Sequence, residues 1–372
     1  MPRAVLFTEP GEPLRVEELS LAGPGTDQIR VRLHAAGVCH SDLHVYEAGG
    51  AAMPTPIVLG HEGAGEVVAV GEGVTDFAVG DHVVLCTLIQ CGECDWCRGG
   101  QPTLCRSHPN TFTGALPDGT LPMSRNGVPV RQMAGIGCWS EEVVVHRLSA
   151  VRIPAQMPLT SAALLGCAVV TGFGAVSNVA RVASGDTVAV IGCGGVGLNA
   201  IQAAAIAGAE RIVAVDISPA KLTLAREFGA TDVVDASAGD PIDAVHELTG
   251  GKGTTFALDF VGTATTTRQA VAMTRRGGTV VLTGLAQSQV TFDVNDLIRA
   301  GRTVKGNYMG MGEFRAEYAK LVHLYQEGRL KLDELVSSKL GLHQVHDAFD
   351  AMSSGQVARS VLVHAMTHSV DS

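Results

Sequence analysis

Hydrophobic residues follow two different patterns, and the change between them divides the chain into two parts. From Ala4 to Val151, short runs of β-branched residues are separated by Gly, Pro and Asp, which is typical of strands joined by turns. The clearest runs are Ile29–Leu33, Gly65–Val70, His82–Leu85 and Glu142–Val145. This pattern predicts a β-rich first domain.

The second pattern starts near Met157, where alanines and spaced apolar residues predict a helix over Thr160–Arg181. Apolar runs of strand length then alternate with stretches of helix length. The predicted strands are Val188–Ile191, Arg211–Val215, Asp232–Val234, Phe256–Phe260, Thr279–Leu282 and Val304–Tyr308, and the helices between them include Leu198–Ala207, Pro219–Phe228, Pro241–Leu248 and Thr266–Thr274. Six strands joined by helices predict an α/β fold with a doubly wound parallel sheet.

The last part of the chain is expected to return to the first domain. Beyond Gly310 the pattern predicts a helix over Glu313–Glu327 and a final strand at Ser360–His364, and the tail that follows is expected to be loose. The expected organisation is a first domain over 1–168, a second over 169–308 and a C-terminal return over 309–372.

A glycine turn lies between the first two strands of the second domain. Gly192, Gly194 and Gly197 form the pattern G-x-G-x-x-G, with Gly195 and Val196 inside it. One glycine permits the tight bend, one lets the backbone approach a pyrophosphate, and one allows close contact of helix and strand. Because the helix N-terminus also offers unpaired N–H groups to an anion, we expect a dinucleotide site here.

Asp216 ends the following strand, at the point where a carboxylate accepts hydrogen bonds from a ribose 2′-hydroxyl. A 2′-phosphate would be repelled, so NAD is expected rather than NADP. The alternative is a membrane span, since Val188–Ala209 contains only Asn199 and Gln202 as clearly polar side chains. The glycines gathered in its first half favour the turn.

Length, charge and cysteine content limit the classes of function. A chain of 372 residues with 46% hydrophobic residues is long enough for two globular domains. Its formal charge of −10 offers no basic field for nucleic acid, so no nucleic-acid partner is expected. The N-terminus has no apolar core of signal-peptide length, so we expect a cytoplasmic protein without a membrane partner. Because a reducing compartment keeps thiols free, the nine cysteines indicate metal binding or catalysis more than disulfides.

Four of the cysteines are close together in sequence. Cys91, Cys94, Cys97 and Cys105 form the pattern C-x2-C-x2-C-x7-C, which can close a tetrahedron around one ion. Four thiolates with no open position describe a structural zinc site. An iron–sulfur cluster is the competing interpretation, because thiolates suit both. Zinc is favoured, since nothing near this loop indicates electron transfer.

Cys39, His61 and Cys167 are dispersed, and no spacing rule connects them. A lone histidine or cysteine is more often a buried core residue than a metal ligand. However, Cys39 opens the segment CHSDLH, His61 lies in the segment GHEG, and Cys167 directly precedes the second domain.

The whole chain resembles the zinc-dependent alcohol dehydrogenases of the medium-chain dehydrogenase/reductase superfamily. The segment Gly60–Val67 is similar to the zinc signature of that family, Cys91–Cys105 to its structural-zinc lobe, and Gly192–Gly197 to its cofactor turn, all in the family's order and spacing. Gly80–Val84 also fits. The resemblance implies a GroES-like catalytic domain followed by a Rossmann domain for the cofactor.

The same resemblance implies two zinc ions per chain, one of them structural. The second would be catalytic, bound by Cys39, His61 and Cys167 with one open position. It also implies that Asp42 fixes the tautomer of the zinc-binding histidine and that Glu62 is a transient ligand. The alternative for Glu62 is an ordinary buried, hydrogen-bonded acid.

Further roles implied by the resemblance concern the alcohol proton and the cofactor. Ser41 and His44 match the hydroxyl and imidazole that carry the proton to solvent, although His44 could also be an ordinary surface histidine. The expected cofactor contacts, besides the turn, are His40, Thr171, Asp216, Lys221 and Arg359. His40 stands where many relatives have Arg, so its hold on the pyrophosphate is expected to be weaker.

Two residues are expected to shape the substrate pocket. Thr87 is smaller than the aromatic residue that some relatives have, which leaves room for a bulkier alcohol, and Trp139 is expected on the opposite wall. The segment Thr111–Met133 is expected to be a loop insertion. Cys86, Cys138 and Cys193 have no assigned partner and are interpreted as small apolar fillers.

The expected function is reversible hydride transfer between a primary alcohol, aromatic or of medium chain length, and NAD. The main alternative is a thiol-dependent formaldehyde dehydrogenase, and a remote one is a non-catalytic, zinc-stabilised NAD-binding regulator. A DNA-binding zinc ribbon should carry a basic patch. It is disfavoured because the loop Cys91–Cys105 contains two acidic residues, Glu93 and Asp95, and one basic residue, Arg98. The expected assembly is a homodimer, with a homotetramer as the other option.

Overall fold

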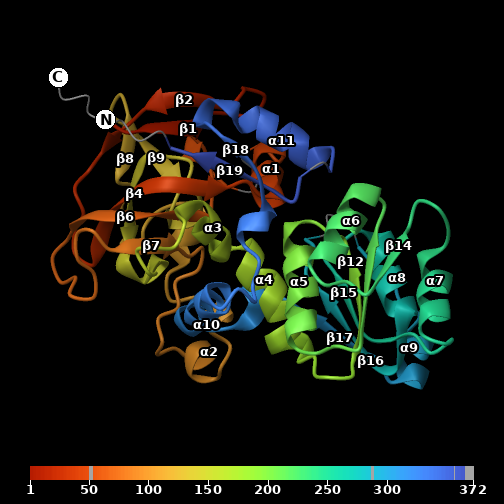
Figure 1. The fold of residues 1–372 in the computed structure, drawn as a ribbon. Helices are drawn as coiled ribbons and strands as arrows, with labels where there is room; N and C mark the ends of the chain where they lie inside the picture. The colour runs from red at the N-terminus through yellow and green to blue at the C-terminus, as the bar shows by residue number, and fades with distance from the viewer. Residues whose placement is uncertain (50–52, 286–288, 356, 365–372) are drawn as a thin grey trace. The chain divides into compact units, whose positions relative to one another are not determined.

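The computed structural model describes residues 1–49, 53–285, 289–355 and 357–364. The chain forms two compact units (Figure 1). Unit 1 comprises Met1–Cys167, Glu313–Tyr325 and the chain from Leu332 onward, and unit 2 comprises Ala168–Gly312 and Gln326–Lys331. Residues 309–312 and 326–331 therefore group with unit 2, although the sequence pattern assigned them to the C-terminal return. Residues 365–372, expected to be loose, lie outside the described part.

Unit 2 is the predicted doubly wound fold. Within the described residues its parallel six-stranded sheet has the order β14–β13–β12–β15–β16–β17. The strands are β12 (Thr187–Ile191), β13 (Arg211–Asp216), β14 (Asp232–Asp235), β15 (Thr254–Asp259), β16 (Thr274–Leu282) and β17 (Thr303–Gly306). This order reverses at β12, and in such sheets ligands bind beyond the carboxyl ends of the strands at the reversal.

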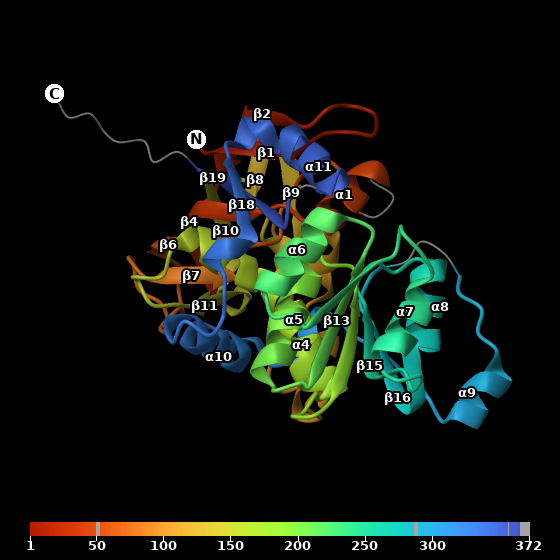
Figure 2. The same cartoon turned by 45° about the vertical axis from the view of Figure 1, so that its right-hand side comes forward.

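Helices cover both faces of this sheet. Figures 1 and 2 show α5 and α6 on one face and α7 and α8 on the other. The helices are α5 (Gly195–Ile206), α6 (Pro219–Glu227), α7 (Pro241–Leu248), α8 (Ala264–Met273) and α9 (Val294–Ala300). Between sheet and helices lies a core of buried aliphatic side chains that includes Ala189, Val213 and Val280. The six predicted strands and the four predicted helices between them are confirmed, with shifts of a few residues at the ends.

The predicted long helix over Thr160–Arg181 is broken in the structure. It consists of α3 (Leu159–Ala163), a 3₁₀ turn at Leu164–Gly166, α4 (Ala168–Gly174) and a π-helical turn at Ala175–Ala180. Cys167 interrupts it with a non-helical φ of −145° and ψ of −68°. The break follows from close contact at Gly166, where a Cβ would stand 2.8 Å from the carbonyl oxygen of Leu85.

Within the described residues, no single helix has the length and apolar character needed to span a membrane. Judged by length and composition only, the bent pair of helices Leu159–Gly166 and Ala168–Ala180 would together be long and apolar enough.

Unit 1 is built around a sheet with the strand order β11–β7–β6–β4–β19–β18, in which β10 also pairs with β4. The strands are β4 (Gln28–Gly37), β6 (Gly63–Val70), β7 (His82–Leu85), β10 (Glu142–His146), β11 (Ala150–Arg152), β18 (Val336–Leu340) and β19 (Arg359–Val363). β19 pairs antiparallel with β4, so the predicted return of the C-terminal strand to the first domain is confirmed. The helices α10 (Phe314–Gln326), apart from its last residue, and α11 (Val345–Ser353) also belong to this unit.

The expected loop insertion Thr111–Met133 is wrong in part, because it contains ordered strands. These are β8 (Met123–Arg125) and β9 (Val128–Gln132), in a second sheet that also contains β1 (Arg3–Phe7), β2 (Arg15–Glu18), β3 (Ser20–Leu21) and β5 (Ile57–Val58). Met123 and Val130 are fully buried in the core of unit 1. Their side chains give these strands a hydrophobic reason to pack.

Candidate metal and cofactor sites

The dispersed residues Cys39, His61 and Cys167 come together in unit 1. Their donor atoms and a carboxylate oxygen of Glu62 all lie within 4.8 Å of one another, and all four side chains are buried. Cys39 directly precedes helix α1 (His40–Glu47), His61 and Glu62 lead into β6, and Cys167 stands at the helix break. Two soft thiolates and an imidazole are a donor set that suits zinc.

Asp42 connects the first two ligands through its buried carboxylate. One oxygen accepts a hydrogen bond from the backbone N–H of Cys39 at 3.0 Å, which caps α1. The other lies 2.9 Å from Nδ1 of His61 and accepts the N–H of Gly60 at 3.1 Å. Because Nδ1 is engaged, Nε2 is the atom of His61 that is left for a metal ion.

The charges around the donor atoms favour a cation. The Cys167 thiol hydrogen-bonds to Cys39, which lowers the pKa of Cys39 well below its usual value and raises the pKa of Cys167. Burial opposes a charged His61, yet the Asp42 carboxylate and the Cys39 thiolate hold its pKa well above the usual value. Surroundings that stabilise a proton on His61 also stabilise a metal cation at the same point.

Glu62 is a buried carboxylate that no hydrogen bond satisfies. Among the described residues, neither of its oxygens has a hydrogen-bond partner, and burial raises its pKa to about 7. Nη2 of Arg359 lies 3.5 Å away and partly offsets the buried charge. The expected alternative of an ordinary hydrogen-bonded acid does not describe this group, whose oxygens are available to a cation.

Arg359, an expected cofactor contact, is itself buried. Its Nη1 donates to the carbonyl oxygen of Val38 at 3.1 Å, and its Nε has no partner among the described residues. Burial disfavours its charge, but Glu62 and the two thiolates raise its pKa above the ordinary value. The guanidinium therefore keeps its charge and retains an unused donor.

The expected proton relay lies on α1, immediately after Cys39. The hydroxyl of Ser41 is 3.9 Å from the sulfur of Cys39. His44 follows Ser41 by three residues, so both project from neighbouring positions on the helix surface. The ring of His44 is 6.3 Å from that of His40, whose side chain is exposed. The helix thus leads from the buried ligand set toward more exposed imidazoles.

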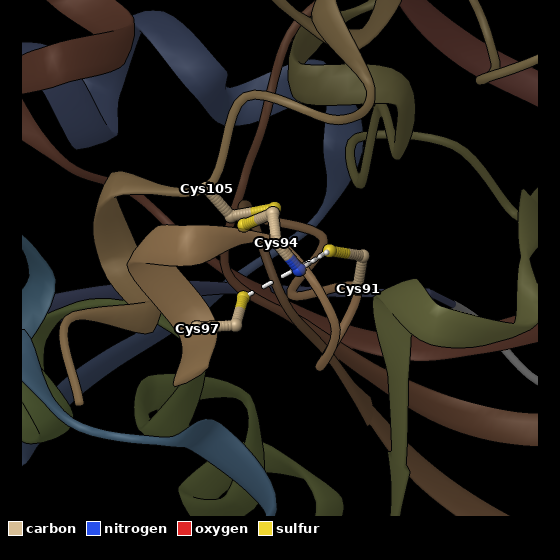
Figure 3. Close-up of side chains that lie close together, drawn as sticks. All are labelled: Cys91, Cys94, Cys97 and Cys105. Carbon is tan, nitrogen blue, oxygen red and sulfur yellow. Dashed lines mark hydrogen bonds between the residues drawn. The ribbon is translucent and has the colours of Figure 1, made fainter. Parts of the chain in front are cut away.

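The four clustered cysteines also converge. Figure 3 shows the sulfurs of Cys91, Cys94, Cys97 and Cys105 turned toward a common centre, and all lie within 4.8 Å of one another. The hydroxyl of Ser107 donates to the sulfur of Cys91 at 3.2 Å, and such hydrogen bonds lower the pKa of Cys91 to about 6 against the effect of burial. This donor set fits one tetrahedral zinc ion with no position left for a substrate.

The glycine turn of unit 2 has the geometry that a pyrophosphate needs. Gly192 has a φ of +89°, which favours glycine, and a Cβ on Gly197 would collide with the carbonyl oxygen of Gly192. Nothing lies within 4 Å of the point where a Cβ of Gly194 would stand. Gly195 begins α5, so the helix N-terminus opens onto this space.

Asp216 stands at the end of β13 and is bonded to the turn. One carboxylate oxygen accepts the N–H of Cys193 at 2.7 Å, and the other accepts the N–H of Ser218 at 2.9 Å. A carboxylate oxygen has more than one lone pair, so these bonds leave acceptor capacity for a ribose hydroxyl.

The other expected cofactor contacts of unit 2 have separate places. Thr171 on α4 is buried, and its hydroxyl lies 3.7 Å from the sulfur of Met309. Val196 lies in the first turn of α5. A Cβ built on Gly172 would stand 2.1 Å from the carbonyl oxygen of Val196, so the two backbones pack closely. Lys221 is half-exposed on α6 and near enough to Cys193 to influence its pKa.

The two expected pocket residues differ in their surroundings. Thr87 lies just beyond β7, and its side chain is half-exposed. Trp139 is fully buried in the core of unit 1, where Nε1 donates to the carbonyl oxygen of Gly37 at 3.2 Å and the ring centroid lies 5.6 Å from that of Phe349. A side chain with no exposed surface cannot line a pocket in this conformation, so the expected wall role of Trp139 is replaced by a core role.

Sequence reasoning missed several residues around these sites. Ser107 is separated from Cys91 by 16 positions, and Gln90 bonds across 224 positions to Phe314. Cys86 is buried as expected, but it also contacts the buried Tyr318, whose hydroxyl acts on its pKa. None of these pairs belongs to a motif, and the sequence pattern predicted the helix that carries Phe314 and Tyr318 but not its contacts.

Two protein-family models match this chain. One, described as an alcohol dehydrogenase GroES-like domain, matches residues 25–155. The other, described as a zinc-binding dehydrogenase, matches residues 195–327.

Relatives and solved structures match nearly the whole chain. A probable S-(hydroxymethyl)glutathione dehydrogenase 1 of Schizosaccharomyces pombe is 39% identical over 94% of this chain and 94% of its own length. A putative alcohol dehydrogenase D of Mycobacterium tuberculosis is 39% identical over 97% and 99%. The crystal structure of benzyl alcohol dehydrogenase from Acinetobacter calcoaceticus matches with a TM-score of 0.92 at 32% identity, covering 98% of this chain and 99% of that one.

Proposed function

Because this chain belongs to the zinc-dependent alcohol dehydrogenases of the medium-chain dehydrogenase/reductase superfamily, we propose that it oxidises bulky primary alcohols, aromatic or of medium chain length, reversibly with NAD. The observation that carries the proposal is the convergence of Cys39, His61 and Cys167 beside the hydroxyl of Ser41. A closed set of four protein ligands would bind a metal ion, but three ligands leave a position for a substrate oxygen.

Zinc bound by Cys39, His61 and Cys167 would supply a Lewis acid that eases loss of the alcohol proton, and bound NAD would supply the hydride acceptor. The protein residues prepare this chemistry. Asp42 holds the ring of His61 in one tautomer and one orientation. Glu62 offers unused carboxylate oxygens beside the ligands, while Arg359 keeps that buried negative charge tolerable.

Ser41 and His44 move the proton in this proposal. The serine hydroxyl lies close enough to the ligand set to accept the proton of a bound alcohol as it donates its own. The imidazole then releases a proton toward solvent, because histidine side chains exchange protons near neutral pH.

The cofactor is held by the glycine turn and by Asp216. The N-terminus of α5 and the open space at Gly194 would receive the pyrophosphate, and the Asp216 carboxylate would accept a hydrogen bond from a ribose hydroxyl. Thr171, Lys221, His40 and Arg359 are proposed as additional contacts.

The proposed preference for bulky alcohols rests on the size of Thr87. A threonine leaves more space than an aromatic side chain at the point where β7 ends. The structural similarity to a benzyl alcohol dehydrogenase supports the same choice. Thr87→Phe should therefore lower kcat/KM for aromatic alcohols more than for short ones.

A panel of substrates tests the proposed function. Purified protein would be mixed with NAD and with ethanol, hexanol or benzyl alcohol, and with formaldehyde in the presence and absence of glutathione. We expect NADH formation without added thiol, fastest for benzyl alcohol or hexanol. Turnover that occurs only with formaldehyde and glutathione would instead assign the activity named for the fission-yeast relative.

We further propose a homodimer formed through the edge of the sheet of unit 2. Within the described chain β17 pairs only with β16, and all four of its residues are exposed. Val304 on β17 and Val294 and Ile298 on α9 expose 38%, 63% and 71% of their surface. An unpaired strand flanked by exposed aliphatic side chains can continue its sheet into a second copy.

We propose a cytoplasmic location for the protein. All nine cysteines lie within the described residues and form no disulfide there, and six of them belong to the two donor sets, which function only as reduced thiols.

A further inference from the structure

One irregular segment of unit 1 connects the two metal sites. It starts at Cys86, where β7 ends, carries Thr87, and ends at Gln90 before the clustered cysteines. The residue before it, Leu85, lies beside Gly166, the residue before Cys167: a Cβ built on Gly166 would stand 2.8 Å from the carbonyl oxygen of Leu85. A displacement of this segment would therefore move Thr87 relative to the reacting centre.

Thr87 does not determine its own position. Its hydroxyl oxygen is buried and has no hydrogen-bond partner in the described part of the chain. Backbone pairing supports the start of the segment, where the N–H of Cys86 donates to the carbonyl oxygen of Ser149 at 2.7 Å. Beyond that bond the chain has left the sheet, so other contacts must set the place of Thr87.

The first such contact is made by Gln90. Its side-chain oxygen accepts the backbone N–H of Phe314 at 2.9 Å. Phe314 begins α10, and the first N–H groups of a helix have no partner within the helix. The bond therefore satisfies a helix end and attaches one end of the segment to α10, the blue helix of Figures 1 and 2.

The second contact is made by Tyr318, one helical turn further along α10. Its ring is stacked on that of Phe314 with centroids 5.7 Å apart, and its side chain is fully buried. Its hydroxyl has no hydrogen-bond partner among the described residues, but it is near enough to the thiol of Cys86 to affect the pKa of that group. Burial raises the pKa of Tyr318 far above the ordinary value and the pKa of Cys86 to about 12. The stacked ring therefore places an uncharged side chain close to the other end of the segment.

We propose that Gln90 and Tyr318 are positioning residues for substrate selection: together they clamp the segment Cys86–Gln90 to α10 and so fix Thr87 relative to Cys167. The two contacts lie on either side of Thr87, one before it and one after it. This inference rests on the proposed role of Thr87 in the pocket. Neither residue supplies a donor atom to either metal set, so their effect reaches the reaction only through Thr87.

The clamp predicts a change in selectivity rather than a general loss of activity. The acceptor is removed in Gln90→Ala, kept in Gln90→Glu, and the hydroxyl alone is removed in Tyr318→Phe. The exposed Ala319 on the same helix supplies the matched control Ala319→Ser. For each variant, kcat and KM are measured for benzyl alcohol and ethanol, and zinc per chain is determined.

We expect the ratio of kcat/KM for benzyl alcohol over ethanol to change about 5- to 20-fold in Gln90→Ala, mainly through KM, because pocket contacts discriminate by roughly this amount. Tyr318→Phe should change the ratio in the same direction by less. Gln90→Glu and Ala319→Ser should leave it near the wild-type value, and all four should retain two zinc ions.

Combination with Thr87→Ala separates this inference from the function on which it rests. If the clamp acts through Thr87, the effect of Gln90→Ala should shrink below about twofold in the Thr87→Ala background, since coupled residues are not additive. An undiminished effect there, or an unchanged ratio in both Gln90→Ala and Tyr318→Phe, overturns the clamp while the pocket role of Thr87 stands. An unchanged ratio in Thr87→Ala alone refutes that pocket role and the clamp together.

Discussion

Asp216 combines a structural and a recognition role in one carboxylate. It holds the backbone of the glycine turn through Cys193 and is the proposed acceptor of a ribose hydroxyl. Asp216→Ala removes both and also removes the charge that repels a 2′-phosphate. We expect the preference for NAD over NADP to narrow by about 10- to 100-fold, the usual value of a hydrogen bond to a charged group.

The matched control for this prediction is Asp216→Asn, which keeps an acceptor oxygen for Cys193 but loses the charge. Its KM for NAD should rise less than that of Asp216→Ala, while its KM for NADP should fall in a similar way. Kinetics with both cofactors measure the difference. A wild-type enzyme that used NADPH as fast as NADH at equal low concentrations would disprove the interpretation of Asp216.

The proton path makes a second prediction at the scale of single residues. His44→Gln should slow alcohol oxidation most near neutral pH, with a loss near the low end of the 10²- to 10⁴-fold range of general base catalysis, and added buffer base should partly restore the rate. Ser41→Ala should lose more and respond less to buffer, because the hydroxyl lies next to the ligand set.

The pH dependence of turnover in both variants distinguishes these roles. Equal losses at every pH in the two variants would mean that His44 only supports the structure of α1 and that protons leave by another route.

Residues that belong to motifs could be predicted from the sequence, and residues that act through long-range packing could not. The resemblance of the segment around His61 identified the ligands, and the structure brings Cys39 and Cys167 beside it. The bond of Gln90 to Phe314 depends on how two distant segments meet. The prediction that Trp139 lines a pocket wall failed because the sequence does not distinguish an aromatic side chain at a pocket from one buried in the core.

The loop Cys91–Cys105 is expected to depend on its metal ion for stability. Its regular elements are the short helix α2 (Asp95–Arg98) and a 3₁₀ turn in which Pro102 and Thr103 are buried, so a bound metal ion should contribute much of the loop's stability. Cys94→Ser should lower the free energy of unfolding by on the order of 4 kcal/mol, as loss of a structural metal does, and leave about one zinc ion per chain.

The exposed Glu93 of the same loop provides the control Glu93→Gln, which should keep two zinc ions and the wild-type stability. Thermal unfolding followed together with zinc analysis makes the measurement. Unchanged stability in Cys94→Ser after loss of its zinc would show that the loop does not depend on the ion.

Element types were more predictable than element continuity. The spacing of apolar residues identified the helical character of Thr160–Arg181 but not its interruption at Cys167. That interruption comes from the close approach of Gly166 to Leu85, which is a tertiary contact. β8 and β9 were missed because they are short: they pair with each other as a hairpin, and each also pairs with a strand far away in sequence, β3 or β5.

At the scale of the whole molecule, the proposed homodimer depends on the exposed edge of unit 2. Ile298→Asp places a charge among the aliphatic side chains of α9 and should shift the protein from dimer to monomer at micromolar concentration. Val79, which exposes 64% of its surface in unit 1, provides the control Val79→Asp. Sedimentation of both variants measures the mass, and an unaffected dimer in Ile298→Asp would exclude this edge as the interface.

The division of the chain into two units was predictable, because the pattern of hydrophobic residues changes from one unit to the other. Strand–helix alternation indicated the doubly wound sheet, and its order around β12 is the one expected for dinucleotide folds. The sequence predicted that the C-terminal strand returns to the first domain, but it did not identify β4 as its partner. Nothing in the sequence predicts that residues 326–331 belong to unit 2.

The central claim is that one of two zinc sites, formed by Cys39, His61 and Cys167, is required for alcohol oxidation. The most direct measurement is zinc per chain together with NADH formation from benzyl alcohol, in the wild type and in Cys39→Ser. We predict about two zinc ions and alcohol-dependent NADH formation in the wild type, and about one zinc ion, an intact fold and nearly no turnover in the variant. Iron with visible charge-transfer absorption in place of zinc, or full turnover in Cys39→Ser, would contradict the account.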